Sequence, residues 1–155
     1  MTAKPVPEGF HSLTPYLSVN GAAAAIDFYK RAFGATEQYC LAMPDGKIAH
    51  AQLRIGDSAL MLDDTRAEGR FQDPRALGGT TMALYFYTPD VDALFNQATA
   101  AGAEVVEPVK DQFYGDRSGA LKDPFGHVWY IATHREDVSE DEVQRRAEAL
   151  FSTVA

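Results

Sequence analysis

The sequence repeats one order of elements twice, and this repeat limits the folds that the chain can adopt. The two predicted helices end at Gly34-Ala35 and Gly102-Ala103, 68 positions apart, and the turn glycines Gly56 and Gly126 lie 70 positions apart. Each half reads as a strand, a helix and three further strands. Regular spacing of this kind indicates repeated structural units. The sequence therefore predicts two β-α-β-β-β modules, similar in the order and spacing of their elements rather than in their residues.

The clearest local signal is the last turn of the second half, Asp123-Pro124-Phe125-Gly126. Proline sets φ for the turn, aspartate bonds its own backbone, and glycine supplies the left-handed corner. The residues on both sides can alternate across a sheet. The stretch is therefore predicted to be the β-hairpin that ends the second module.

This turn and the apolar strand after it resemble the closing hairpin of the vicinal oxygen chelate superfamily, the glyoxalase and bleomycin-resistance proteins. The longer string from Tyr114 to His134 resembles the PhnB-like branch, often labelled demethylubiquinone-methyltransferase-like. The resemblance covers nearly the whole chain and includes three earlier segments, Thr14–Leu17, Phe28–Ala35 and Gly56–Leu62. It implies an α+β fold in which two βαβββ modules form one cupped mixed sheet.

The expected organisation is a single glyoxalase-like domain over residues 1–155. Its modules span about 11–63 and 80–133. The first strand is expected to begin at His11, and a strand of the second module is expected from Gln112 to Leu121. The charged connector 64–79 reads as a linker or as a lid over a site. A last helix is expected at 139–152, because Ser139 to Glu142 forms a capping box and an apolar stripe follows.

Composition excludes several functions. The net charge of −8 argues against nucleic acid and against anionic membranes as partners. No apolar run approaches the length of a membrane span, and Met1–Phe10 does not read as a signal peptide. The single Cys40 cannot form a disulfide within the chain, so a cytoplasmic location is expected.

The Gly56-Asp57 turn predicts which side chains share a face of the sheet. In a two-residue hairpin loop Ile55 pairs with Ser58, so the apolar pairs Leu53/Leu60 and Ala51/Leu62 should face the helices. The opposite face combines polar and aromatic groups, which suits a small organic ligand. The residues expected to bind this ligand are Thr14, Tyr16, His50, Gln52, Arg54, Met61, Asp63, Tyr85, Tyr87 and Tyr130.

The resemblance also implies four positions at which metal-dependent members carry ligands. In this chain they fall on Thr14, Met61, Ala83 and Tyr130. Divalent metals at such sites prefer imidazole or carboxylate donors, which these residues lack. The histidines His11, His50, His127 and His134 form no pair at i, i+4. No metal and no other cofactor is therefore expected.

Three functions remain open. The first is a metal-free small-molecule-binding protein, with sequestration of the molecule or resistance to it as the role. The second is a metal-dependent lyase, isomerase or dioxygenase whose ligands lie at other positions. The third is a cofactor-free enzyme that uses His50 and Asp63. A homodimer is expected, because the connector could let two subunits exchange modules.

Two polar groups have competing interpretations. The hairpin register places His50 opposite Asp63, where the carboxylate can accept a hydrogen bond from the imidazole. The pair is a candidate general base or ligand-orienting group. Alternatively, it is a polar pair near the rim of the sheet whose only role is its own hydrogen bond. Arg117 is expected to pair with a carboxylate at a strand end rather than to clamp an anion in the cup.

Overall fold

The computed structural model describes residues 3–66, 68–69 and 71–153. The first module consists of β1 (Tyr16–Val19), α1 (Ala22–Phe33), β2 (Thr36–Ala42), β3 (Ile48–Ile55) and β4 (Ser58–Asp64). A short helix, α2 (Pro74–Leu77), lies in the connector. The second module consists of β5 (Ala83–Tyr87), α3 (Val91–Ala101), β6 (Glu104–Asp111), β7 (Asp116–Lys122) and β8 (Val128–His134), and α4 (Glu140–Ser152) follows.

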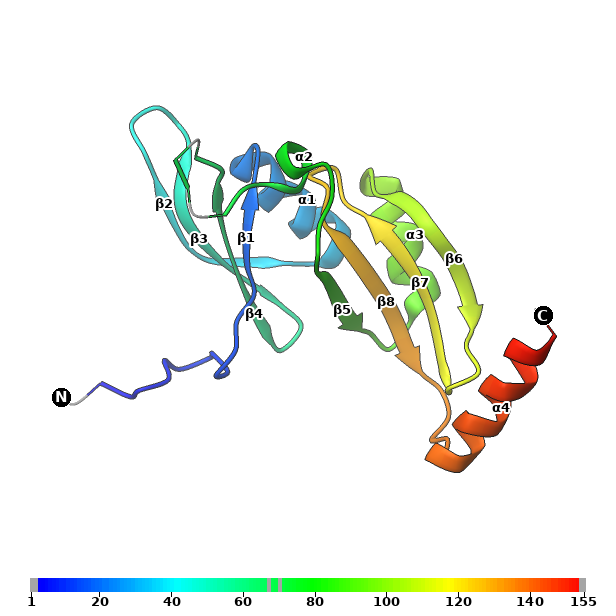
Figure 1. Ribbon diagram of the computed structural model, residues 1–155. Coiled ribbons are helices and arrows are strands. Elements are labelled where there is room, and N and C mark those ends of the chain that lie inside the picture. Colours follow the sequence, from blue (N-terminus) through cyan, green and yellow to red (C-terminus); the bar gives the residue numbers. More distant parts are fainter. Residues whose placement is uncertain (1–2, 67, 70, 154–155) are drawn as a thin grey trace.

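Each module contributes one four-stranded mixed sheet. The strand orders are β1-β4-β3-β2 and β5-β8-β7-β6, with β1 parallel to β4, β5 parallel to β8, and the remaining pairs antiparallel. The sheets lie side by side with β1 and β5 as the facing edges, and α1 and α3 cover one side (Figure 1). The predicted α+β fold of two βαβββ units with a C-terminal helix is confirmed. The uncovered side of the two sheets is called the concave face below.

Helix α1 shows how local sequence and distant contacts combine. Apolar residues recur on its inner side, and Gly34 ends it in the left-handed conformation at φ 67°. The N–H groups at its start donate to a side chain at the end of β4, because the residue before the helix, Gly21, has no side chain to accept them. The Asp64 carboxylate accepts from the amides of Gly21 and Ala22 at 3.0 and 2.9 Å, and also from Ile48 at 2.7 Å. One buried side chain thus joins the helix start to β3 and β4.

The β3–β4 hairpin has the register that its turn predicts. Ile55 pairs with Ser58, Leu53 with Leu60, and Ala51 with Leu62. These apolar residues are buried toward α1, apart from Ser58 at the turn. Gln52 pairs with Met61 on the other side of the strands, so the concave face carries the expected residues.

The two modules share one core, and Asp123 lies where they meet. Its carboxylate accepts from the Tyr29 hydroxyl of α1 at 2.6 Å and from the Trp129 indole of β8 at 2.9 Å. The same carboxylate accepts the amides of Phe125 and His127, which closes the predicted turn. The His127 ring reaches across to the Ser18 carbonyl at 3.1 Å. A residue singled out as a turn former is therefore also a buried joint between modules.

Two strand boundaries differ from the prediction. The first strand begins at Tyr16, not at His11, and the Leu13 side chain is 88% exposed. Proline at position 15 has no N–H for a ladder, although its carbonyl still accepts from Met61. The strand expected from Gln112 begins at Asp116, because residues 112–115 form the turn between β6 and β7 with Gly115 at φ 105°.

Helix α4 begins where the capping box predicts. The Ser139 hydroxyl accepts from the Glu142 amide, and Arg146 bonds Glu136, Glu142 and the carbonyl of Phe113. These polar contacts hold the helix at the end of the second module, from which it projects (Figure 1). It has no buried residue, and Leu150 and Phe151 are exposed. Among the described helices, none is long and apolar enough to cross a membrane.

Candidate functional site

The concave face of the first module carries a hydrogen-bonded cluster from three strands. The Tyr16 hydroxyl of β1 lies 2.9 Å from Nδ1 of His50 and 3.4 Å from Oδ2 of Asp63. The Gln52 amide lies 3.1 Å from Nε2 of the same ring. His50 and Asp63 therefore share the Tyr16 hydroxyl as a partner and do not form the direct hydrogen bond that the register suggested. Tyr16 reaches the space between them because β1 runs parallel beside β4.

The Asp63 carboxylate is half-buried, and this position changes its acidity. Burial raises the pKa of Asp63, while Arg66, the hydrogen bond from Tyr16 and the charge of His50 act in the opposite direction. Burial and the neighbouring carboxylate also raise the pKa of Tyr16. The Tyr16 phenol therefore stays protonated in the neutral range and can donate its one proton to His50 or to Asp63.

Part of the connector lies over this cluster. The Phe71 ring meets the Tyr16 ring edge-on, with 5.5 Å between centroids. Beside them is a hollow of about 350 Å³ whose wall includes Asp63, Arg66 and Phe71. The linker interpretation of the connector is thus incomplete, since one of its side chains covers a face on which ligand binding was expected.

The concave face of the second module is aromatic. Tyr85 and Tyr130, on the neighbouring strands β5 and β8, stack with 5.7 Å between centroids and 7° between ring planes. Tyr87 lies next along β5, with its ring 5.1 Å from that of Tyr85. The rings of Tyr85 and Tyr87 are about half exposed. They form an apolar, π-rich wall that is open to a ligand.

Behind these rings lies a buried carboxylate that sequence reasoning missed. Asp116 accepts from the Tyr87 hydroxyl at 2.8 Å and from the Tyr85 hydroxyl at 3.4 Å, and His134 Nδ1 lies 2.7 Å from its other oxygen. The second ring nitrogen of His134 lies 2.9 Å from Asp137. These two contacts raise the pKa of His134 above its ordinary value. A ring held between two carboxylates donates from both nitrogens, which requires the protonated form.

Burial, followed by the contact with Tyr114, raises the pKa of Tyr85, and the hydrogen bond to Asp116 raises that of Tyr87. Both phenols therefore keep their protons at neutral pH. The only sequence signal for this cluster was the string from Tyr114 to His134, which contains Asp116 and His134, the two partners of one of its hydrogen bonds.

A cleft of about 570 Å³ lies between the modules, where the edge of β5 faces the start of β1 and the β3–β4 turn. Thr14, Tyr85 and Tyr87 line it together with core residues such as Trp129. This volume lies in the range of small-molecule sites.

The remaining predicted residues have simpler surroundings. The Arg54 guanidinium donates to the carbonyls of Asp57 and Gly9, so it ties the N-terminal arm to the β3–β4 turn. Met61 pairs with Gln52 on β3 and with Tyr16 on β1, beneath the first cluster. Arg117 points away from the concave face and forms a bidentate bond with Asp92 of α3 at 2.8 and 2.9 Å, as a structural ion pair would.

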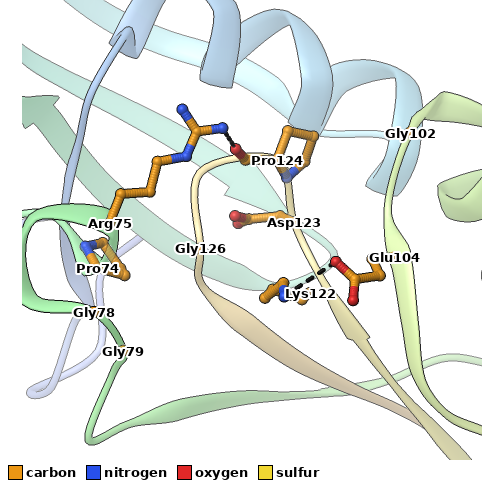
Figure 2. A pocket seen from close by; sticks show the side chains of 10 residues that line it. All are labelled: Pro74, Arg75, Gly78, Gly79, Gly102, Glu104, Lys122, Asp123, Pro124 and Gly126. Atoms are coloured by element: carbon orange, nitrogen blue, oxygen red, sulfur yellow. Dashed lines mark hydrogen bonds and ion pairs between the residues drawn. The ribbon is translucent and has the colours of Figure 1, made fainter.

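A second hollow, of about 460 Å³, lies between α2 and the β7–β8 turn (Figure 2). Its charged groups are already paired. The Arg75 guanidinium donates to the Pro124 carbonyl, and Lys122 bonds Glu104 at 3.0 Å. Gly126 lies tightly against Pro74, where a Cβ atom would stand 2.9 Å from the proline ring. This region reads as the joint that fastens the connector to the second module.

Three comparisons with known proteins agree with this architecture. The sequence model of the Glyoxalase/Bleomycin resistance protein/Dioxygenase superfamily matches residues 9–131. An uncharacterized protein of Mycobacterium bovis, Mb0911c, is 44% identical over 136 residues, which cover 86% of this chain and 90% of that protein.

Among solved structures, TioX from Micromonospora sp. ML1 is 28% identical, with a TM-score of 0.63, and the match covers 80% of this chain and 98% of TioX. A PhnB protein of Bacillus cereus is 19% identical, with a TM-score of 0.63, over 79% of this chain and 99% of that one. The latter likeness concerns the fold alone.

Proposed function

Because the chain belongs to the glyoxalase, bleomycin resistance protein and dioxygenase superfamily, we propose that it binds a small organic molecule on its concave face, without a protein-bound metal. The observation that carries the proposal is the aromatic wall of Tyr85, Tyr87 and Tyr130 beside the cleft between the modules. Rings that are half exposed in the free protein leave apolar area for a ligand to cover. The biological role would be sequestration of, or resistance to, that molecule.

The donor set is the reason for a metal-free site. The positions that the family resemblance assigns to metal ligands hold Thr14, Met61, Ala83 and Tyr130, and these side chains do not fit a divalent ion. Within the described ranges, no three His, Cys, Asp or Glu side chains lie close enough together to hold a metal. The proposed function therefore includes no chemical step at a metal.

A second candidate function is favoured by the Tyr16 cluster. Its hydroxyl lies within hydrogen-bond reach of both His50 and Asp63, and a cluster of this kind can move a proton to or from a ligand. In that case the protein is a cofactor-free enzyme whose acid–base groups lie in the first module. Turnover of a bound compound that is lost in Tyr16→Phe would favour this candidate over simple binding.

We also propose a homodimer in the cytoplasm. The exposed apolar side chains Leu13 and Phe151, on the N-terminal arm and on α4, support an interface between two copies. The lack of a second cysteine to pair with Cys40 supports a reducing compartment. Light scattering at micromolar concentration should give twice the chain mass, and a monomer mass would contradict the dimer.

The binding proposal is tested by thermal shift against a panel of small aromatic and dicarbonyl compounds, since a ligand of the native state raises the melting temperature. Hits should be weakened in Tyr130→Ala, which removes one ring of the stacked pair. They should be unchanged in Leu77→Ala, which removes an exposed apolar side chain from α2, away from the concave face. Protein purified without chelator is analysed for metal, and a stoichiometric divalent ion would overturn the metal-free proposal.

A further inference from the structure

One cluster within the concave face has a chemistry that the proposed function does not use. It consists of Asp116, His134, Tyr85 and Tyr87, and it is called the second-module cluster here. It lies at the end of the face from which α4 projects (Figure 1), where β5, β7 and β8 bring together residues up to 49 positions apart in the sequence. Asp116 itself is buried, whereas both tyrosine rings are open to solvent.

The hydrogen bonds within this cluster use the protons of its two phenols, so these groups can only accept hydrogen bonds from a ligand. A phenol has one proton: Tyr87 directs its proton at Asp116 Oδ2, and Tyr85 directs its proton at the same oxygen or at the neighbouring Tyr114. The polar capacity that these hydroxyls still present to a ligand is therefore the lone pairs of their oxygens. Carboxylates accept only, so Asp116 and Asp137 add no donor. A complementary ligand must bring the N–H groups itself.

The electrostatic surroundings favour a positive ligand as well. Two carboxylates, Asp116 and Asp137, flank the single imidazolium of His134, so one negative charge remains in excess. Two nearby arginines are bonded elsewhere, Arg117 to Asp92 and Arg146 to Glu136, and the charge of Arg135 acts on Asp92, whose pKa it helps to lower. The ring faces of Tyr85 and Tyr87 add the negative side of their π quadrupoles, which attracts cations.

We propose that the second-module cluster binds the cationic group of an organic ligand, an alkylammonium or a guanidinium that donates N–H bonds. The cation lies against the faces of Tyr85 and Tyr87 and bonds their hydroxyl oxygens, while the buried Asp116 supplies the counter-charge. This inference rests on the proposed function, because it names the ligand class of the same face.

Three probes of equal ring size separate the chemistry of the ligand from its shape. Isothermal titration of the intact protein with benzylammonium, benzyl alcohol and benzoate should rank their affinities in that order. Benzylammonium is expected to bind about tenfold more tightly than benzyl alcohol, as cation–π and charge-assisted contacts imply. Its affinity should fall as salt is raised, whereas that of the alcohol should not.

Variants locate the binding. Tyr87→Leu removes both ring and oxygen and should weaken benzylammonium about tenfold, and Tyr87→Phe, which keeps the ring, should weaken it less. Tyr39→Leu is the matched control, since Tyr39, on β2 of the first module, is 50% exposed against 57% for Tyr87. Should Tyr87→Leu fail to fold, Tyr87→Phe and the ranking of probes on the wild-type protein still decide the question.

Equal or tighter binding of benzoate or benzyl alcohol overturns the cation inference but leaves small-molecule binding on the face intact. A loss of affinity in Tyr39→Leu as large as that in Tyr87→Leu would also overturn the cation inference and leave small-molecule binding on the face intact. If none of the three probes binds, the inference falls, and the proposed function is then judged by the compound panel alone.

Discussion

The two modules share one order of elements, yet the carboxylate on the concave side differs between them in burial and in hydrogen bonding. In the first, Asp63 is half-buried and has one long hydrogen bond, 3.4 Å from the Tyr16 hydroxyl. In the second, Asp116 is buried and has close contacts to Tyr87 and His134 at 2.8 and 2.7 Å. The same scaffold therefore offers one acid with spare bonding capacity and one that is fully engaged.

The difference comes from what covers each acid. The backbone after β8 folds over the start of β7, where the amides of Arg135 and Glu136 both donate to the Gly115 carbonyl at 3.0 Å. This brings His134 and Asp137 onto Asp116. In the first module the connector contributes Phe71, which contacts Tyr16 but leaves Asp63 at the wall of a hollow. Local burial rather than residue type thus decides which acid keeps spare hydrogen-bonding capacity.

The sharpest test of this contrast is the removal of each carboxylate in turn. Asp116→Ala leaves the Tyr87 hydroxyl and the His134 ring without their acceptor, and we expect it to lower the free energy of unfolding by about 2–3 kcal/mol. Asp63→Ala should cost less than about 1 kcal/mol, because a half-exposed group can bond water instead. Urea unfolding measures both, and equal losses would show that the two acids are held alike.

The second test uses pH. The folded pKa of His134 is raised by Asp137 and Asp116, so its contribution to stability is fully present below its ordinary pKa of about 6.5 and is lost as pH rises through the folded value. The stability difference between wild type and His134→Gln should therefore shrink as pH rises from 6 toward 9. Asp137→Asn should weaken this dependence. A difference that grows with pH would mean that the ring is not held as a cation.

The smallest expected effect concerns the first module. Tyr16→Phe keeps the ring against Phe71 but removes the hydroxyl whose bond helps to hold down the pKa of Asp63. We expect the Asp63 titration, followed by carboxyl ¹³C NMR, to move to higher pH in the variant, with stability changed by less than about 1 kcal/mol. An unmoved titration would mean that Tyr16 and Asp63 do not interact in solution.

Sequence patterns were sufficient for features that depend on neighbours in the chain. The Gly56-Asp57 turn fixed the β3–β4 register, Gly34 ended α1, and the Ser139 capping box began α4. The face on which Tyr16, His50 and Asp63 lie also followed, since strand residues alternate.

The contacts of these side chains did not follow, because they join distant strands. Tyr16 stands between His50 and Asp63 from a strand more than 30 positions away, and Asp64 caps a helix 42 positions earlier. The buried state of Asp116 depends on a segment that returns after β8. Alternation assigns a residue to a face, but only the packing of the elements decides which partners it meets there.

The hydrogen bond from Tyr29 to Asp123 bears on how the molecule comes apart. A phenol from one module and a carboxylate from the other meet in the interior, so separation of the modules would replace this buried bond by contacts with water and would expose the shared core. The modules therefore behave as halves of one cooperative unit rather than as independent folding domains. Cleavage within the connector would yield complementary fragments that need each other to keep their native structure.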